Sequence, residues 1–320
     1  LGTTRTLTCA AVSLTDVDFR DITIAGAAAP ATGTRIGDCK GNSGITFDAA
    51  KTVYWRGGTG TFGAANWSNT SGGGTNTIYF PLAQDTAIFN DANVTTGATA
   101  TVNSGYNLGT LDMSGLVSNT MTLATGSQTP TIYGNWINGT GTTLTGTGTM
   151  TFSGRGSQTI TSAGKTFTQG ISIATPGGSV TLQDAFNTNR GTNKSIDLSA
   201  GTFSAGTYNV TLSNGITTGA TLTGYTKSID FGSGTFTVGG TSTCFNFNDS
   251  INLTISGTGT IKMTGASAKS FFSTGLSFSG ITLDQGGAGT LTINGNNTFK
   301  DITNTYSATG ATAITIGTTT

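Results

Sequence analysis

Short stretches in which apolar and polar residues alternate recur along most of the chain. From Asn93 onward they return roughly every 8 to 14 residues, a spacing typical of successive short strands, with Gly, Asn or Ser between them. In each stretch the outer apolar residues point to one side of an extended strand and the central Thr points to the other. The pattern predicts short strands with an apolar interior and a threonine-rich exterior. The clearest examples are Ala100-Thr101-Val102, Met121-Thr122-Leu123, Val180-Thr181-Leu182, Val210-Thr211-Leu212, Leu253-Thr254-Ile255 and Leu291-Thr292-Ile293.

One long stretch occurs twice, which indicates stacked repeating units. Residues 146–173 align with residues 257–283, and only Gln169 has no counterpart in the second copy. A shorter echo reads SIDLSAGTF from Ser195 and SIDFGSGTF from Ser228. Repetition at this scale is typical of solenoids, in which each unit buries its apolar face only against its neighbours.

These patterns predict an all-β fold, a right-handed parallel β-helix (β-solenoid) with irregular coils of roughly 20 to 30 residues. A β-sandwich has the same local alternation, but the long-range repeat favours the β-helix. We divide the chain into N-terminal β-helix coils at 1–50, an aromatic-rich Gly loop insertion at 51–92 and a repetitive β-solenoid at 93–320. Because a rod of this kind ends in exposed strand edges, we expect copies of the chain to associate, with a trimer as one arrangement.

The segment 51–92 holds much of the aromatic content of the chain within a Gly-rich context. Two interpretations of this segment remain open. Flat rings bury the faces of sugars well, which makes Trp55, Trp67 and Tyr79 the candidates for carbohydrate contact. The alternative, which we favour, is a hydrophobic plug that covers or bends the solenoid.

Composition excludes several functions. Charged residues are only 9% of the chain, the net charge is zero, and all 14 acidic residues are Asp because the chain contains no Glu. Without His the chain lacks the usual general base and a common zinc ligand. Asp16, Asp18 and Asp21 cluster without the spacing of a calcium loop. We therefore expect no metal site and no cofactor. With no basic stretch and no apolar run long enough to span a bilayer, we also expect neither nucleic-acid binding nor membrane insertion.

Any polysaccharide cleavage would have to rely on pairs of Asp. Glycosidases need two carboxyl groups about 5 to 9.5 Å apart. Asp184, Asp197, Asp230 and Asp249 each stand alone in the sequence, although Asp197 and Asp230 hold equivalent places in the shorter echo and are candidates for stacking on one face. Structural roles are favoured for all four, so we expect no catalytic residues and no enzymatic activity.

The three cysteines, Cys9, Cys39 and Cys244, lack the CxxC spacing of metal and redox sites. The interval between Cys9 and Cys39 is close to the expected length of one coil, which would place them on neighbouring coils and permit a disulfide. Buried free thiols are the default alternative, because a free Cys packs as a small hydrophobic residue.

Two stretches near the N-terminus resemble a known family. The segment 37–47, GDCKGNSGITF, follows DFRDITIAG and resembles a segment of large structural proteins of marine bacteriophages. The residues from Trp55 to Trp67 are similar to the W-x-G-G-x-G-x-[WF]-x-x-x-x-W segments of those proteins, which also occur in secreted bacterial repeat proteins of the autotransporter type. The two motifs lie in the N-terminal part of the chain, and the rest of the chain resembles those proteins only in its general sequence pattern.

The resemblance implies a structural virion protein, a rigid β-helical tail fibre or other appendage used in attachment to the host surface. Its implied partners are other virion proteins and host surface polysaccharide, and its location is the virion. Because the second motif is shared, a secreted bacterial adhesin at the cell surface is the first alternative. A tail spike enzyme that degrades polysaccharide is the second.

Overall fold

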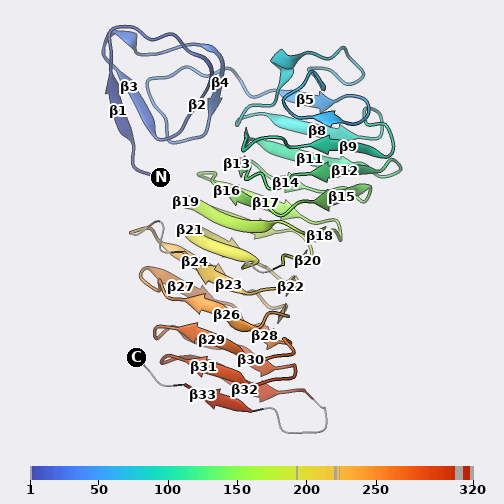
Figure 1. Cartoon of the computed structure of the whole chain (residues 1–320). Coiled ribbons are helices and arrows are strands. Elements are labelled where there is room, and N and C mark those ends of the chain that lie inside the picture. The colour runs from blue at the N-terminus through green and yellow to red at the C-terminus, as the bar shows by residue number, and fades with distance from the viewer. Residues whose placement is uncertain (1, 192–193, 220–221, 223, 307–312, 318–320) are drawn as a thin grey trace. The chain divides into compact units, whose positions relative to one another are not determined.

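The chain folds into a β-solenoid without α-helices among the described residues, in a computed structural model. The structure describes residues 2–191, 194–219, 222, 224–306 and 313–317. The chain divides between Ala163 and Gly164 into two compact units, and each contains its own stack of parallel turns (Figure 1). The predicted all-β parallel β-helix is therefore confirmed.

The first unit begins with two small parallel sheets. Strand β1 (Arg5–Thr8) pairs with β3 (Ile22–Ala25), and β2 (Thr15–Phe19) pairs with β4 (Thr34–Asp38). A 3-10 turn, η1 (Gly26–Ala28), follows β3. The Gln84 side chain joins these coils to later ones, because it accepts from the Asp38 amide at 2.9 Å and donates to the Ile36 carbonyl at 3.1 Å.

The rest of the first unit stacks in three parallel series of strands. The first series is β5 (Thr52–Trp55), β8 (Thr86–Asn90), β11 (Thr110–Gly115), β14 (Trp136–Ile137) and β17 (Ser157–Thr161). The second is β10 (Asn107–Leu108), β13 (Thr131–Ile132) and β16 (Thr149–Phe152). The third is β6 (Gly60–Thr61), β9 (Ala98–Thr101), β12 (Met121–Ala124) and β15 (Thr142–Thr145).

The second unit is built in the same way, and several of its strands are longer. One series is β18 (Thr166–Phe167), β20 (Phe186–Thr188), β22 (Val210–Leu212), β25 (Thr235–Val238), β28 (Thr260–Met263), β30 (Ser277–Gln285) and β32 (Thr298–Asn304). The remaining strands are β19 (Gly170–Leu182), β21 (Ile196–Ser204), β23 (Ile216–Thr218), β24 (Lys227–Asp230), β26 (Ser242–Phe247), β27 (Leu253–Ser256), β29 (Lys269–Ser273), β31 (Leu291–Asn294) and β33 (Ile314–Ile316). Strand β21 pairs with β23 through its first residues and with β24 through its last ones.

The strands bury the residues that the alternation predicts. In β12, Met121 and Leu123 are 1% and 0% exposed, whereas Thr122 between them is partly exposed. The parallel register then places Thr122 beside Thr99 on one side and Thr143 on the other. In the series of β9, β12 and β15, apolar residues thus face the interior, and a column of threonine lies on the outer face.

Coil length varies along the solenoid, and this variation determines which residues become neighbours. Val210 of β22 pairs with Phe236 of β25, whereas Leu283 of β30 pairs with Ile302 of β32. The first of these coils is the longer one. A difference of a few residues in coil length therefore moves an equivalent sequence position from one side of the solenoid coil to the next side.

The shorter sequence echo demonstrates this effect. Ile196, at the start of β21, pairs with Ile216, whereas its counterpart Ile229 pairs with Phe203 at the end of β21. The two SID stretches therefore lie on different sides of the turn. The repeat in the sequence encodes a strand-and-turn unit rather than a fixed place in the coil.

Residues 51–92 lie inside the first unit and contain one enlarged coil. Thr52 of β5 pairs with Thr86 of β8, and Thr86 pairs in turn with Thr110 of β11, which follows it after a much shorter interval. The extra residues form an excursion that holds β7 (Trp67–Ser68), which pairs antiparallel with β5, and the 3-10 turn η2 (Thr77–Tyr79). Both ends of the segment are ordinary coil strands, β5 and β8.

Candidate functional site

The tryptophans of the enlarged coil form a buried aromatic cluster. Trp55, Phe62, Trp67 and Phe89 are each 0% exposed. The centroid of the Trp67 ring lies 5.3 Å from the ring centroid of Trp55, 5.2 Å from that of Phe62 and 5.5 Å from that of Phe89, in each case edge to face. Its indole nitrogen donates to the Phe62 carbonyl at 2.9 Å. The geometry is that of a small hydrophobic core shared by the enlarged coil and the strand β8 that follows it.

This burial corrects the expectation that Trp55 and Trp67 contact carbohydrate, because neither ring presents a face to a ligand. The two rings instead pack with Phe62 and Phe89 in a buried hydrophobic cluster. The third candidate, Tyr79, is partly exposed at the end of η2, where the Asn76 side chain accepts from the Ile78 amide at 3.1 Å. It does not line the hollow described next.

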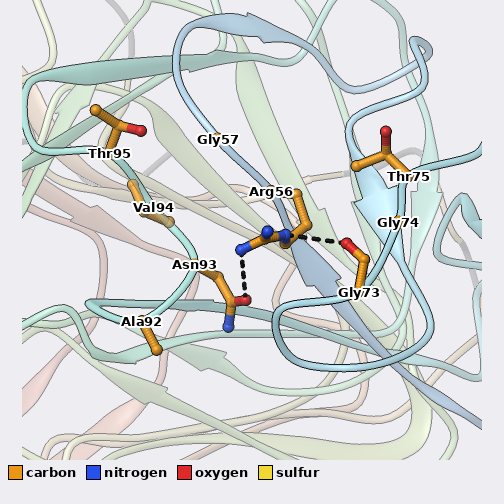
Figure 2. A pocket seen from close by; sticks show the side chains of 9 residues that line it. All are labelled: Arg56, Gly57, Gly73, Gly74, Thr75, Ala92, Asn93, Val94 and Thr95. Carbon is orange, nitrogen blue, oxygen red and sulfur yellow. Dashed lines mark hydrogen bonds between the residues drawn. The ribbon is translucent and has the colours of Figure 1, made fainter.

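A shallow hollow of about 520 Å³ lies beside the aromatic cluster, where the excursion meets the turn after β8 (Figure 2). Three segments form it: the start of the excursion, the glycine turn before η2 and the chain that follows Phe89. The lining residues are Arg56, Gly57, Gly73, Gly74, Thr75, Ala92, Asn93, Val94 and Thr95. It is therefore a glycine- and threonine-lined surface with one cation.

Arg56 is held in a fixed orientation across this hollow. Its Nε donates to the Gly73 carbonyl at 3.2 Å and its Nη1 donates to the Asn93 side-chain oxygen at 3.3 Å (Figure 2). Asn93 is only 4% exposed, and the same oxygen accepts from the Gly72 amide at 2.8 Å. The Asn93 amide group donates to Asn90 at 2.7 Å, which fixes the orientation of its side chain.

A glycine turn and backbone hydrogen bonds bring these segments together. Gly57 has a φ of +91°, a conformation that favours glycine, and its carbonyl accepts from the Thr95 amide at 2.9 Å. At the base of the excursion, Lys51 forms an ion pair with the buried Asp85 at 3.1 Å. The Asp85 carboxylate also accepts from the Leu82 amide at 2.9 Å, so the two ends of the segment are tied together.

Arg56 and Asn93 were not identified as site residues from the sequence. The signal for Arg56 was present, because it is the only charged residue between Lys51 and Asp85. Asn93 carries no comparable signal, since Asn is abundant throughout the chain and its burial depends on how the excursion folds back.

Several acidic residues have structural partners. Asp16 pairs with Arg35 at 2.5 Å, Asp18 accepts from Asn107 at 2.8 Å, and Asp21 pairs with Arg155. Within the described part of the chain, no group of three His, Cys, Asp or Glu side chains is arranged to hold a metal ion. In the same residues, no helix has the length and the hydropathy required to cross a membrane.

The suggested stacking of Asp197 and Asp230 is wrong. Asp197 lies in register with Ser172 and Thr217, whereas Asp230 lies between Ser204 and Ser256. The Asp230 carboxylate accepts from the Ser204 hydroxyl at 2.8 Å and from the Gly232 amide at 2.9 Å. Asp249 is occupied by an ion pair of 2.5 Å with Lys227.

The disulfide suggested between Cys9 and Cys39 is also absent, because both side chains are free thiols, as is Cys244. Cys9 follows β1, which pairs with β3, and Cys39 follows β4, which pairs with β2. Because these first coils are shorter than the sequence led us to expect, the two cysteines fall on different sheets. Burial raises the pKa of the Cys39 thiol to about 12.

Comparisons with protein-family models, with curated proteins and with solved structures find no match to this chain.

Proposed function

We propose that this chain is a structural component of a bacteriophage particle, a rigid β-solenoid of a tail fibre or other appendage that contacts the host surface. The observation that carries the proposal is the repeated parallel pairing of strands within each unit. Successive turns share backbone hydrogen bonds, so a load applied along the stack is distributed over many inter-strand bonds. An extended attachment organelle needs such stiffness.

The outer face of the turns supports the same role. It is rich in threonine columns such as Thr99, Thr122 and Thr143, in a chain with only 9% charged residues. A neutral, hydroxyl-bearing surface is compatible with the environment outside a cell, where salt and pH vary, because it depends little on ionic contacts. The resemblance of the N-terminal motifs to phage structural proteins supports the virion as the location.

Immunogold labelling of purified phage particles, with antibodies raised against this chain, tests the proposal. Gold at the tail or at another appendage is the expected result. Labelling of bacterial cells instead would support the secreted adhesin, whose W-x-G-G-x-G segment the chain shares. Sedimentation of the purified chain tests the proposed association with copies of itself, for which a trimer is one arrangement.

The enzymatic alternative is tested separately. Asp197 and Asp230 lie on different sides of the turn, and Asp249 is paired with Lys227, so we propose that the chain does not cleave polysaccharide. Incubation with host surface polysaccharide, followed by size-exclusion chromatography, is expected to leave the polymer length unchanged. Shortened chains would identify the protein as a tail spike enzyme.

A further inference from the structure

We propose that the hollow around Arg56 binds the carboxylate of an acidic sugar within a surface polysaccharide. The inference rests on the proposed attachment function and gives it a ligand class. It is carried by an oriented guanidinium that has no anionic partner among the described residues, in a hollow whose other walls are neutral (Figure 2).

Arg56, which lines the hollow, retains unused hydrogen-bonding capacity. A guanidinium has five N–H donors in a planar fork. The described residues supply acceptors for Nε and Nη1 of Arg56 but none for Nη2. The ion pairs formed by the described residues do not include Arg56 either. A planar carboxylate would satisfy the remaining donors with the bidentate geometry that it prefers.

The acidic residue nearest to Asn93 in the sequence, Asp91, is engaged elsewhere. Its carboxylate accepts from the amides of Val117, Ser118 and Asn119 at 2.9 to 3.1 Å. These hydrogen bonds, led by those from Asn119 and Ser118, hold the pKa of Asp91 below its usual range and engage its carboxylate with the segment 117–119 of the next coil. It is not the counter-ion of Arg56.

The arginine is positioned before any ligand arrives. Asn93 is 4% exposed and has its own partners, so the Asn93–Arg56 hydrogen bond belongs to the folded coil rather than to the bound state. Ordering a free arginine side chain opposes binding, and here that entropy is lost during folding.

The remaining walls suit a sugar ring. Gly57 and Gly74 have open space where a side chain would project, because a Cβ built on either meets no atom within 4 Å. The Thr75 and Thr95 hydroxyls and the exposed backbone provide donors and acceptors for sugar hydroxyl groups. The hollow is open along one side, which fits one residue of a continuous polymer better than an enclosed small molecule.

The test uses the full chain and tetrasaccharides of alginate, a polymer of uronic acids, in isothermal titration calorimetry. The expected result is saturable binding that weakens with added salt and is lost when the same oligomer has its carboxyl groups reduced to alcohols. A sulfated, carboxyl-free oligosaccharide of the same length separates carboxylate recognition from general attraction to anions, and we expect it to bind more weakly.

Two variants locate the binding in the hollow. Arg56→Gln removes the charge and is expected to weaken binding about tenfold or more, since charge-assisted bidentate contacts are the strong ones. Gly74→Leu fills the hollow without changing the charge, and because Gly74 is outside the left-handed region and has open space around it, the substitution is compatible with the fold. It is expected to abolish binding.

Each variant has a matched control outside the hollow. Arg5→Gln changes the same charge on an exposed strand, and Gly156→Leu changes another glycine with open space around its Cβ position. Both should bind as the parent chain does, and thermal denaturation of all four variants should confirm folding.

Three outcomes would overturn the inference: no binding of alginate oligomers, equal binding by Gly74→Leu and Gly156→Leu, or tighter binding of the sulfated oligomer. None of them affects the immunogold result, so failure of this site and failure of the proposed function are distinguishable.

Discussion

Replacing Trp67 by Ala tests whether the aromatic cluster is a core or a ligand surface. Trp67 is 0% exposed and is packed edge to face against Trp55, Phe62 and Phe89. A buried aromatic side chain of about 150 to 250 Å² contributes on the order of 4 to 6 kcal/mol at about 25 cal/mol per Å². The cost observed for Trp→Ala changes in cores, about 3 to 5 kcal/mol, agrees with this value.

The measurement is thermal and urea denaturation followed by far-ultraviolet circular dichroism. In a unit of the size of Leu1–Ala163, 1 kcal/mol corresponds to about 2 to 4 °C, so we expect Trp67→Ala to lower the melting temperature by about 6 to 20 °C. Trp67→Phe keeps a ring in the cluster but leaves the Phe62 carbonyl without its donor, at a cost of about 1 to 3 kcal/mol.

Val117→Ala is the control for this series, because Val117 is 68% exposed and its truncation should change stability by less than about 0.5 kcal/mol. If Trp67→Ala melts at the same temperature as Val117→Ala, the packing argument is refuted. A stable Trp67→Ala protein with impaired polysaccharide binding would restore the tryptophan to the role of a ligand contact.

Three further predictions follow from buried or tightly bonded groups. Asp249→Asn leaves Lys227, whose side chain is 1% exposed, without its counter-ion, and should lower the free energy of unfolding measured in urea by about 3 to 5 kcal/mol. The double variant Lys227→Met/Asp249→Asn should recover part of this loss. Equal stability of the single variant and the parent chain would contradict the prediction. The pKa of Asp91 is lowered in the folded state, so its contribution to stability is present above the ordinary value of 3.8 and is lost as the pH falls through the folded-state pKa. The difference in melting temperature between the parent chain and Asp91→Asn should therefore shrink from about pH 6 toward about pH 2. A difference that stays constant over this range would refute the prediction. Thiol titration in denaturant without reductant should detect three free cysteines, and detection of a single thiol would instead indicate a disulfide. In the native protein, burial raises the pKa of the Cys39 and Cys244 thiols, so both should react slowly.

The fold was predictable because its determinants are local. Met121 and Leu123 alternate with Thr122, and this pattern needs only the two-residue period of a strand to be interpreted correctly. The repeat at residues 146–173 and 257–283 then distinguishes stacked coils from a sandwich, since only stacking gives a repeated unit a neighbour on each side.

The neighbours of each residue could not be predicted in the same way, because they depend on coil length. Asp197 and Asp230 occupy equivalent positions in the sequence yet lie on different sides of the turn, and Cys9 and Cys39 lie on different sheets. No local sequence pattern indicates whether a coil will be short or long. Turn residues such as Gly and Asn occur throughout the chain, so they mark the corners without fixing the distance between them.

The candidate site was missed for a related reason. The aromatic density of the segment favours Trp55 and Trp67 as site residues, but the excursion buries both completely. Arg56, directly after Trp55, lies where the chain leaves the coil and is oriented by the distant Asn93. Such a pairing depends on how the enlarged coil closes on itself.

The enlarged coil also bears on how this protein can diversify. The chain needs more residues to pass from Thr52 to Thr86 than from Thr86 to Thr110, yet β8 continues in parallel register with β11. Lengthening a loop is entropically inexpensive, about 0.6 kcal/mol for each doubling. The stretch between β7 and η2 is consequently a natural position for exchanging recognition sequences, whether by recombination in nature or by grafting a peptide in the laboratory.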